Sequence, residues 1–208
     1  MTPASSAPCR KTREPAWKRG FDVVVSLIGL TLSVPVFLLV ALLVRLDSRG
    51  PVFFVQPRLG RRGRVFLLYK FRTMFDAPRE STHEILPGNP DVTPLGGFLR
   101  RFKIDELPQL WNVLRGDMSV VGPRPALPKQ AQELDEVGRV RLEVRPGLTG
   151  LAQVHGNVYL SWPERWRYDR DYVMRLSAPL DLWILWQTAL VALWGERRFH
   201  KPYEEEPA

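Results

Sequence analysis

Two adjacent acidic residues, Asp105 and Glu106, are the strongest candidates for chemistry in this chain of 208 residues. Adjacent carboxylates at the start of a helix usually cap it and interact with its macrodipole, so a structural role is the first interpretation. The surrounding sequence favours a second interpretation, because basic residues flank the pair on both sides. They are Arg100, Arg101 and Lys103 before it, and Arg115, Arg124 and Arg145 after it.

A basic pocket around two carboxylates suits the chemistry of phosphate esters. Arginine makes bidentate contacts with phosphate, and the prolines beside Arg124 and Arg145 restrict the backbone there. One carboxylate can attack phosphorus and carry a covalent intermediate, and nearby positive charge is expected to keep it ionised. The other can bind a divalent cation that bridges a diphosphate.

The cysteine and histidine content limits the choice of metal. The single cysteine, Cys9, excludes an internal disulfide and a cysteine cluster, and the three histidines show no ligand spacing. A metal would therefore have oxygen ligands, which favours Mg2+ or Mn2+. The net charge of +8 favours anionic partners: nucleic acid, anionic lipid or phosphorylated substrates.

The segment 21–44 is almost wholly apolar, with Asp22 as its only charged residue. As a straight helix it would reach about 35 Å, close to the thickness of a bilayer core, so a transmembrane helix is one interpretation. Pro35 predicts a bend instead, at which Ser33 can bond to a freed carbonyl.

The flanks of this segment also favour a bend. Lysine and arginine mark the cytoplasmic side of a membrane segment, and here they occupy both ends. We therefore predict a re-entrant helix that enters and leaves one leaflet, rather than a spanning helix or a cleaved secretory signal. The basic residues are Arg10, Lys11, Arg13, Lys18 and Arg19 before it, and Arg45, Arg49, Arg58, Arg61, Arg62 and Arg64 after it.

The rest of the chain predicts a small α/β globular domain of the α+β type, mostly helical. Aromatic and β-branched runs at 52–56 and 65–71 predict a hairpin, and 77–94 a loop. A short helix is expected at 98–102, and a second begins near Asp105 and ends at Gly116. Further on we expect an extended or turn-rich loop at 121–128, a polar amphipathic helix at 129–142 and a turn at 145–150.

A second apolar run, 180–194, is short for a membrane span and contains Trp183, Trp186 and Trp194. It predicts either an interfacial helix or a buried core helix. The expected organisation is a disordered tail, a re-entrant helix-turn-helix, a cytosolic catalytic domain, an interfacial helix and a second tail. Their ranges are 1–15, 16–48, 49–178, 179–195 and 196–208.

Five short motifs occur in order behind the apolar segment: KFRTM at 70–74, DELPQLWN at 105–112, GDMS at 116–119, GPRP at 122–125 and RPGLTG at 145–150. Together they resemble the bacterial sugar transferase family, the monotopic polyprenyl-phosphate phosphoglycosyl transferases, in its minimal form. The resemblance extends over about residues 16–195. One difference concerns the residues after LAQV, where the family often reads Asn-Gly-Arg-Asn and this chain has HGNV at 155–158. The resemblance therefore carries over the type of reaction but not the recognition of a particular sugar.

The resemblance implies a ping-pong reaction. Asp105 would attack the β-phosphate of a UDP-sugar and release UMP, and the phosphosugar would then pass to undecaprenyl phosphate, the first membrane step of glycoconjugate or exopolysaccharide assembly. Glu106 would hold Mg2+, and Arg100, Arg124 and Arg145 would lie near the phosphates and nucleotide. The bend would match a Ser-Pro pair of the family, here Ser33 and Pro35 with one residue between them.

Some questions stay open at the level of sequence. Lys70 and Arg72 either contact the ligand or support the fold. The resemblance places the protein at the cytoplasmic face of the bacterial inner membrane; the identity of the sugar and the oligomeric state, a homodimer among the alternatives, are undetermined. A non-catalytic basic adaptor on the membrane surface is the main rival. Nucleic-acid binding is disfavoured by the apolar segment and by the absence of a binding motif.

Overall fold

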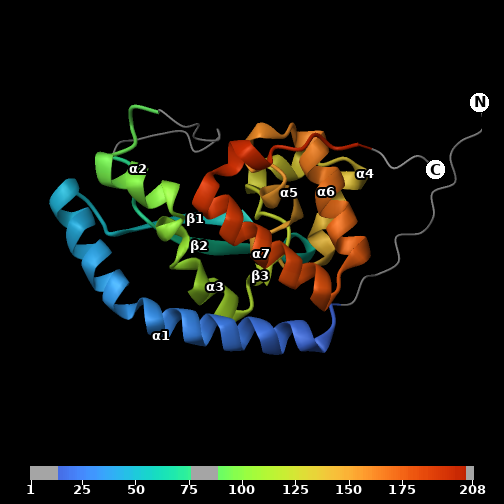
Figure 1. Cartoon of the computed structure of the whole chain (residues 1–208), viewed down its shortest axis with the longest axis horizontal. Coiled ribbons are helices and arrows are strands. Elements are labelled where there is room, and N and C mark those ends of the chain that lie inside the picture. Colours follow the sequence, from blue (N-terminus) through green and yellow to red (C-terminus); the bar gives the residue numbers. More distant parts are fainter. Residues whose placement is uncertain (1–13, 76–88, 205–208) are drawn as a thin grey trace, which may run out of the picture.

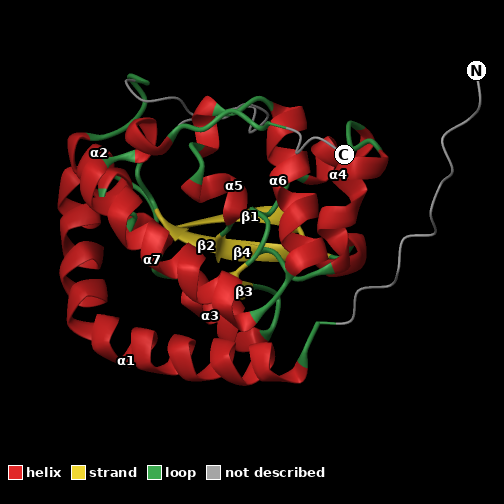
Figure 2. Cartoon of the chain, turned by 45° about the vertical axis from the view of Figure 1, so that its right-hand side comes forward, coloured by secondary structure: helices red, strands yellow, loops and turns green. Residues whose placement is uncertain are grey.

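The apolar N-terminal segment forms one helix, α1 (Ala16–Asp47), which runs along the outside of the domain. The structure is a computed structural model and describes residues 14–75 and 89–204. Figures 1 and 2 show that α1 is bent: its first part passes beneath α3 (Gln109–Arg115), and its second part rises beside α2 (Pro94–Arg101). Among the described residues, α1 is the one helix long and apolar enough to cross a bilayer.

Pro35 lies inside α1, and the chain stays helical on both sides of it. Proline removes one backbone hydrogen bond and crowds the preceding turn, which bends a helix without ending it when the neighbouring turns are intact. The hydroxyls that bond to helix carbonyls before this point belong to Ser26 and Thr31, which donate to Asp22 O and Leu27 O. The expected role of Ser33 at the bend stays a prediction.

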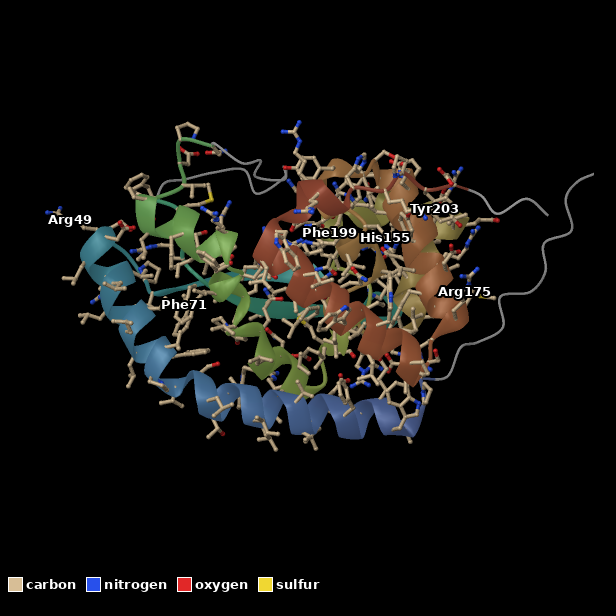
Figure 3. All side chains as sticks on the ribbon, in the orientation of Figure 1. Arg49, Phe71, His155, Arg175, Phe199 and Tyr203 are labelled. Atoms are coloured by element: carbon tan, nitrogen blue, oxygen red, sulfur yellow. The ribbon has the colours of Figure 1, made fainter. Side chains whose placement is uncertain are left out.

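Both parts of α1 pack against the same domain. In the first part, the buried carboxylate of Asp22 accepts hydrogen bonds from the Ser119 hydroxyl and the Val120 amide, each at 2.9 Å. In the second part, Val40 and Val44 pack in a cluster that includes Phe71, whose side chain lies on the inner side of α1 (Figure 3). The outward side is apolar and exposed, with Leu27, Ile28, Leu32, Leu38, Leu39 and Leu42.

Two of the basic residues expected to flank the membrane segment point into the protein. Lys18 is fully buried, with its ammonium 2.6 Å from the Asp181 carboxylate. Arg19 donates to the carbonyls of Val113 and Leu114, so it satisfies the C-terminal end of α3. Arg10, Lys11 and Arg13 lie outside the described residues, as does most of the tail 1–15.

The hairpin predicted near residue 60 is confirmed. β1 (Phe53–Leu59) pairs antiparallel with β2 (Val65–Phe71), so that Phe53 lies opposite Phe71 and Leu59 opposite Val65. The connection uses left-handed conformations at Arg62 and Gly63. The predicted loop at 77–94 lies mostly outside the described residues. Within them α2 begins at Pro94, earlier than expected, because Thr93 caps the helix and proline suits its first turn.

A second sheet corrects the turn expected at 145–150. β3 (Ser119–Val121) and β4 (Gly147–Thr149) are parallel neighbours, and β4 occupies the middle of that segment. The two backbone segments approach closely: a Cβ on Gly147 would lie 2.1 Å from the Gly122 nitrogen. Position 147 therefore requires glycine for steric reasons. The close approach results from the pairing of β3 with β4, which are far apart in sequence.

The prediction of one helix at 129–142 is also wrong, because the structure has three short helical pieces there. A 3-10 turn (Pro128–Gln132), α4 (Glu136–Val140) and a second 3-10 turn (Arg141–Glu143) follow one another. Asp135 interrupts the run because its side chain accepts from the Gly138 amide and caps α4. The predicted end of α3 at Gly116 is confirmed, with a left-handed φ of 90°.

The C-terminal helices complete a mostly helical α+β domain. α5 (Leu151–Val154) and α6 (Trp162–Arg175) pack beside α4 and α7 (Ala178–Trp194), and α6 begins with a capping box between Ser161 and Glu164. One side of α7 enters the core through Ile184 and Val191. The other side is exposed and carries Trp183, Trp186 and Trp194, so α7 combines the features of the core and interfacial interpretations.

Candidate active site

Asp105 and Glu106 lie in a tight turn between α2 and α3, within the 3-10 segment Ile104–Glu106. Lys103 precedes them in a left-handed conformation with φ 58°, which turns the chain away from α2. The Asp105 side chain is only 6% exposed. The helix expected to begin near Asp105, with Asp105 or a neighbour as its cap, begins instead at Gln109 after Pro108, and no side chain caps it.

The Glu106 carboxylate is held between two cationic side chains. The ammonium of Lys70 lies 2.6 Å from Oε1, and a terminal nitrogen of Arg124 lies 3.3 Å from the same oxygen. The contacts join β2, the turn that carries Asp105 and Glu106 (hereafter the central turn) and the loop after β3. Three motifs separated in sequence therefore meet at one carboxylate oxygen.

Asp105 differs from its neighbour in its contacts. No described residue donates a hydrogen bond to its carboxylate, although Lys70, Arg100, Lys103 and Glu106 act on it electrostatically. A carboxylate without a hydrogen-bond donor keeps its lone pairs for another group, which suits a nucleophile. Glu106, by contrast, is fixed in orientation by its partners.

The surroundings shift the pKa values of the two acids in opposite directions. Burial raises the pKa of Asp105 above its ordinary value; the charges of Lys70, Arg100 and Lys103 oppose that rise, and Glu106 adds to it. Burial also acts to raise the pKa of Glu106, but Lys70 and Arg124 outweigh it and hold that pKa well below the usual range. The positive charges therefore act on Asp105 in the expected direction but are outweighed by burial, and the expectation that they keep this carboxylate ionised stays a prediction.

The two remaining arginines near the pair are held by the fold. Arg100 of α2 donates its Nε to the Thr73 hydroxyl at 2.8 Å. The backbone carbonyl of Arg124 accepts from Arg141, which forms a buried ion pair with Asp169 of α6 at 3.0 Å. The first contact holds the Arg100 side chain and the second holds the Arg124 backbone, while the Arg124 side chain is 35% exposed.

Arg145 does not join this cluster through its side chain. Its Nε lies 2.9 Å from a Glu14 oxygen, and a terminal nitrogen lies 3.4 Å from Asp22. Only its backbone approaches the loop that carries Arg124, through the close contact at Gly122. The structure therefore places the Arg145 side chain against the start of α1, and a substrate contact for it stays a prediction.

Lys70 and Arg72, whose roles the sequence did not distinguish, have different contacts in the structure. Lys70 contacts Glu106, as described above. Arg72 is 7% exposed and donates to the carbonyls of Val44 and Ser48 and to the Ser48 hydroxyl. It fastens the C-terminal end of α1, where backbone carbonyls lack helical partners. Arg72 therefore supports the fold.

A residue overlooked by the sequence argument is Asn112 of α3, which is fully buried. Its side chain donates to the Leu67 carbonyl at 2.7 Å and accepts from the Tyr69 amide at 3.2 Å. These bonds lock α3 onto β2 and so set the distance between the central turn and Lys70. The available signal was an amide inside the apolar face of a predicted helix, where a polar group needs partners.

The acidic pair suits a magnesium ion only in one mode. No group of three or more acidic, histidine or cysteine side chains occurs among residues 14–75 and 89–204, so these residues form no complete cage. Magnesium commonly binds one or two carboxylates together with substrate phosphates and water. Glu106 fits that mode, because both of its cationic partners contact Oε1 and Oε2 remains for a metal.

Comparison with known proteins supports the resemblance found in the motifs. Residues 13–195 match the model of the bacterial sugar transferase family. An uncharacterized sugar transferase of Bacillus subtilis, EpsL, is 43% identical over 86% of this chain and 88% of its own length. The exopolysaccharide production protein ExoY of Rhizobium meliloti is 39% identical over 82% of this chain and 83% of its length.

A longer relative has a more specific name. The UDP-glucose:undecaprenyl-phosphate glucose-1-phosphate transferase of Escherichia coli is 38% identical over 82% of this chain, which covers 39% of that protein. The matched region contains the acidic turn, the loop of Arg124 and the bent apolar helix. By these matches, this chain belongs to the bacterial sugar transferase family.

Proposed function

We propose that this protein transfers a sugar 1-phosphate from a UDP-sugar to undecaprenyl phosphate and releases UMP. Several relatives have names that state transfer of this kind, with glucose, galactose or N-acetylgalactosamine. The observation that carries the proposal is the buried turn in which Asp105 is unbonded and Glu106 is clamped by Lys70 and Arg124. This arrangement suits a phosphoryl transfer, whereas binding to a membrane surface does not require it.

The proposed chemistry has two displacement steps at one phosphorus atom. An Asp105 oxygen attacks the β-phosphorus of the UDP-sugar, the bond from that phosphorus to the bridging oxygen breaks, and UMP leaves with that oxygen. A phosphate oxygen of the lipid then attacks the same phosphorus and displaces Asp105, which yields a diphosphate-linked sugar. Positive charge from Lys70, Arg100 and Arg124 offsets the negative charge on the phosphates.

Magnesium is part of this proposal. Bound at Oε2 of Glu106, it would offset the charge of the diphosphate and of the leaving UMP. Lys70 and Arg124 keep Glu106 ionised and oriented, which is the state a metal ligand requires.

The proposed location is the cytoplasmic face of the bacterial inner membrane, with α1 re-entering one leaflet. Support comes from the packing of α1: Asp22 in its first part and Val44 in its second part both contact the one catalytic domain. A helix that crossed the bilayer would carry its two ends to opposite sides. The exposed apolar middle of α1 would then enter the lipid.

The experiment that tests this function measures UMP release. Membranes containing the protein are incubated with undecaprenyl phosphate, Mg2+ and a panel of UDP-sugars, and UMP is quantified. We expect release with at least one sugar, dependent on the lipid for multiple turnovers. The absence of release across the panel would overturn the proposal.

A further inference from the structure

A pocket of about 270 Å³ opens beside Glu106, between α3 and α7. Its walls are chiefly aliphatic and come from the central turn, α3, both strands of the second sheet, α5 and α7. The aliphatic residues are Leu107, Leu110, Val120, Leu148, Val154, Leu185, Val191 and Ala192. Glu106 and Leu107 are consecutive residues, so the pocket begins directly beside the reacting carboxylates.

The other polar side chains of the pocket are engaged, except for one atom: Gln153 donates its amide nitrogen to the Leu148 carbonyl, and its buried Oε1 has no partner among the described residues. Lys103 and Glu196 form an ion pair at one end, at 2.5 Å. The hydroxyls of Thr149 and Thr188 lie 2.6 Å apart, and Thr188 also donates to a helix carbonyl. Sugar hydroxyls that lose water need new hydrogen-bond partners, and these walls provide few. A hydrocarbon group fits the lining better than a sugar.

The chemistry of a prenyl phosphate requires such a place. Its phosphate is attached directly to the first carbon of the isoprenoid chain, so hydrocarbon begins within a few bonds of the reacting oxygen. A site that brings this phosphate to Asp105 must therefore present an apolar wall beside the acidic pair. The pocket at Glu106 and Leu107 provides that wall.

The size of the pocket and its surroundings limit what it holds. Pockets that enclose a whole drug-sized ligand have volumes of about 300–1,000 Å³, so this one holds only the beginning of a long chain. The outward side of α7 carries exposed Trp186, Leu193 and Trp194, which suit the membrane interface. The rest of the chain can pass from the pocket into lipid along that side.

We propose that the pocket between α3 and α7 binds the first isoprene units of undecaprenyl phosphate and so places its phosphate at Asp105. The inference rests on the proposed function, which supplies the lipid acceptor. It assigns the UDP-sugar to the basic groups at Glu106, where Lys70 and Arg124 lie outside the pocket lining.

The test fills the pocket from α7. Ala192 lines it, and Ala192→Leu and Ala192→Phe introduce side chains of increasing size. Ala189→Phe is the matched control, because Ala189 is exposed on the same helix and outside the lining. For each purified variant in detergent, kcat/KM is measured separately for undecaprenyl phosphate and for the UDP-sugar, and thermal unfolding checks the fold.

We expect kcat/KM for undecaprenyl phosphate to fall with side-chain size, by at least about tenfold for Ala192→Phe, because a filled apolar pocket rejects its ligand to that degree. The value for the UDP-sugar remains that of the control. Equal lipid kinetics in Ala192→Phe and Ala189→Phe would overturn the inference, and so would a loss confined to the UDP-sugar. Failure of the proposed function looks different, since the unmodified protein would then release no UMP.

Discussion

The ammonium of Lys70 lies 2.6 Å from Oε1 of Glu106, which joins the end of the β-hairpin to the acidic turn. Both side chains are largely buried, at 18% and 12% exposure, so the contact is shielded from water. Breaking a buried ion pair leaves an uncompensated charge, whereas exchanging one cation for another retains it. Lys70 therefore controls the orientation of Glu106 in this protein.

From this contact we predict that Lys70→Met lowers kcat for UMP release by about 100-fold, the usual effect of losing one preorganised electrostatic contact in an active site. Lys70→Arg keeps the charge and should retain clearly more activity. The measurement is UMP release by both purified variants, with thermal unfolding as the check on folding. Equal rates in the two variants would argue against an electrostatic role.

A second prediction concerns the attacking group. Asp105→Asn preserves shape but removes the nucleophilic oxygen, so turnover should be abolished. Incubation with a UDP-sugar labelled in the sugar should attach label to the unmodified protein and none to the variant. Liposome flotation should show the same membrane binding for both. Turnover in Asp105→Asn would refute the assignment of the nucleophile.

A third prediction follows from the packing of both parts of α1 on one domain. Ala16 and Arg49 are exposed just inside one end of the helix and just beyond the other, and they suit single cysteine substitutions in a Cys9→Ser background. A membrane-impermeant thiol reagent should label both positions only in inverted vesicles, where the cytoplasmic face is outside. Labelling of the two positions from opposite sides would contradict the re-entrant arrangement.

A fourth prediction addresses the end of α1. Arg72→Met removes the donors to Val44 and Ser48 and should lower the free energy of unfolding by about 1.5–3 kcal/mol, the range for hydrogen bonds to a charged group. Arg49→Met, at an exposed arginine of the same region, is the control. Thermal unfolding in one detergent compares the two. A similar, small effect in both would mean that Arg72 does not fasten the helix.

The fifth prediction is a pH dependence of stability at Asp169. Burial raises the pKa of Asp169 from 3.8 to about 6, against the opposing charges of Arg141 and Arg165. Between these values the folded protein keeps a proton that the unfolded chain has lost. The contribution of Asp169 to stability is therefore complete below about pH 4 and is lost as the pH rises through about 6.

Because asparagine stays neutral at every pH, Asp169→Asn isolates this contribution. We expect the unmodified protein to lose stability relative to Asp169→Asn between pH 4.5 and pH 7.5, as measured by thermal unfolding in detergent. Asp171→Asn, at a partly exposed acid on the same helix, is the control for the substitution itself. A difference between the protein and Asp169→Asn that is constant with pH would contradict the prediction.

The sequence alone determined those features that depend on neighbouring residues. The hairpin at β1 and β2 was predictable from two β-rich runs around a glycine-containing turn, and the end of α3 from Gly116. The ordered motifs identified the family, and the adjacent acids indicated the candidate reactive turn. These signals are local, since periodicity, turn chemistry and motif order are readable along the chain.

The tertiary structure decided which basic residues reach the acids. Lys70 and Arg72 are two residues apart, yet the strand ends at Phe71, and Arg72 turns to α1 while Lys70 turns to Glu106. Arg145 pairs with Glu14, 131 residues earlier in the chain. Ion pairs and strand pairing across such separations depend on how distant elements pack, and no local pattern records them. The acidic turn was thus visible in the sequence, whereas its partners and the apolar pocket beside it come from the fold.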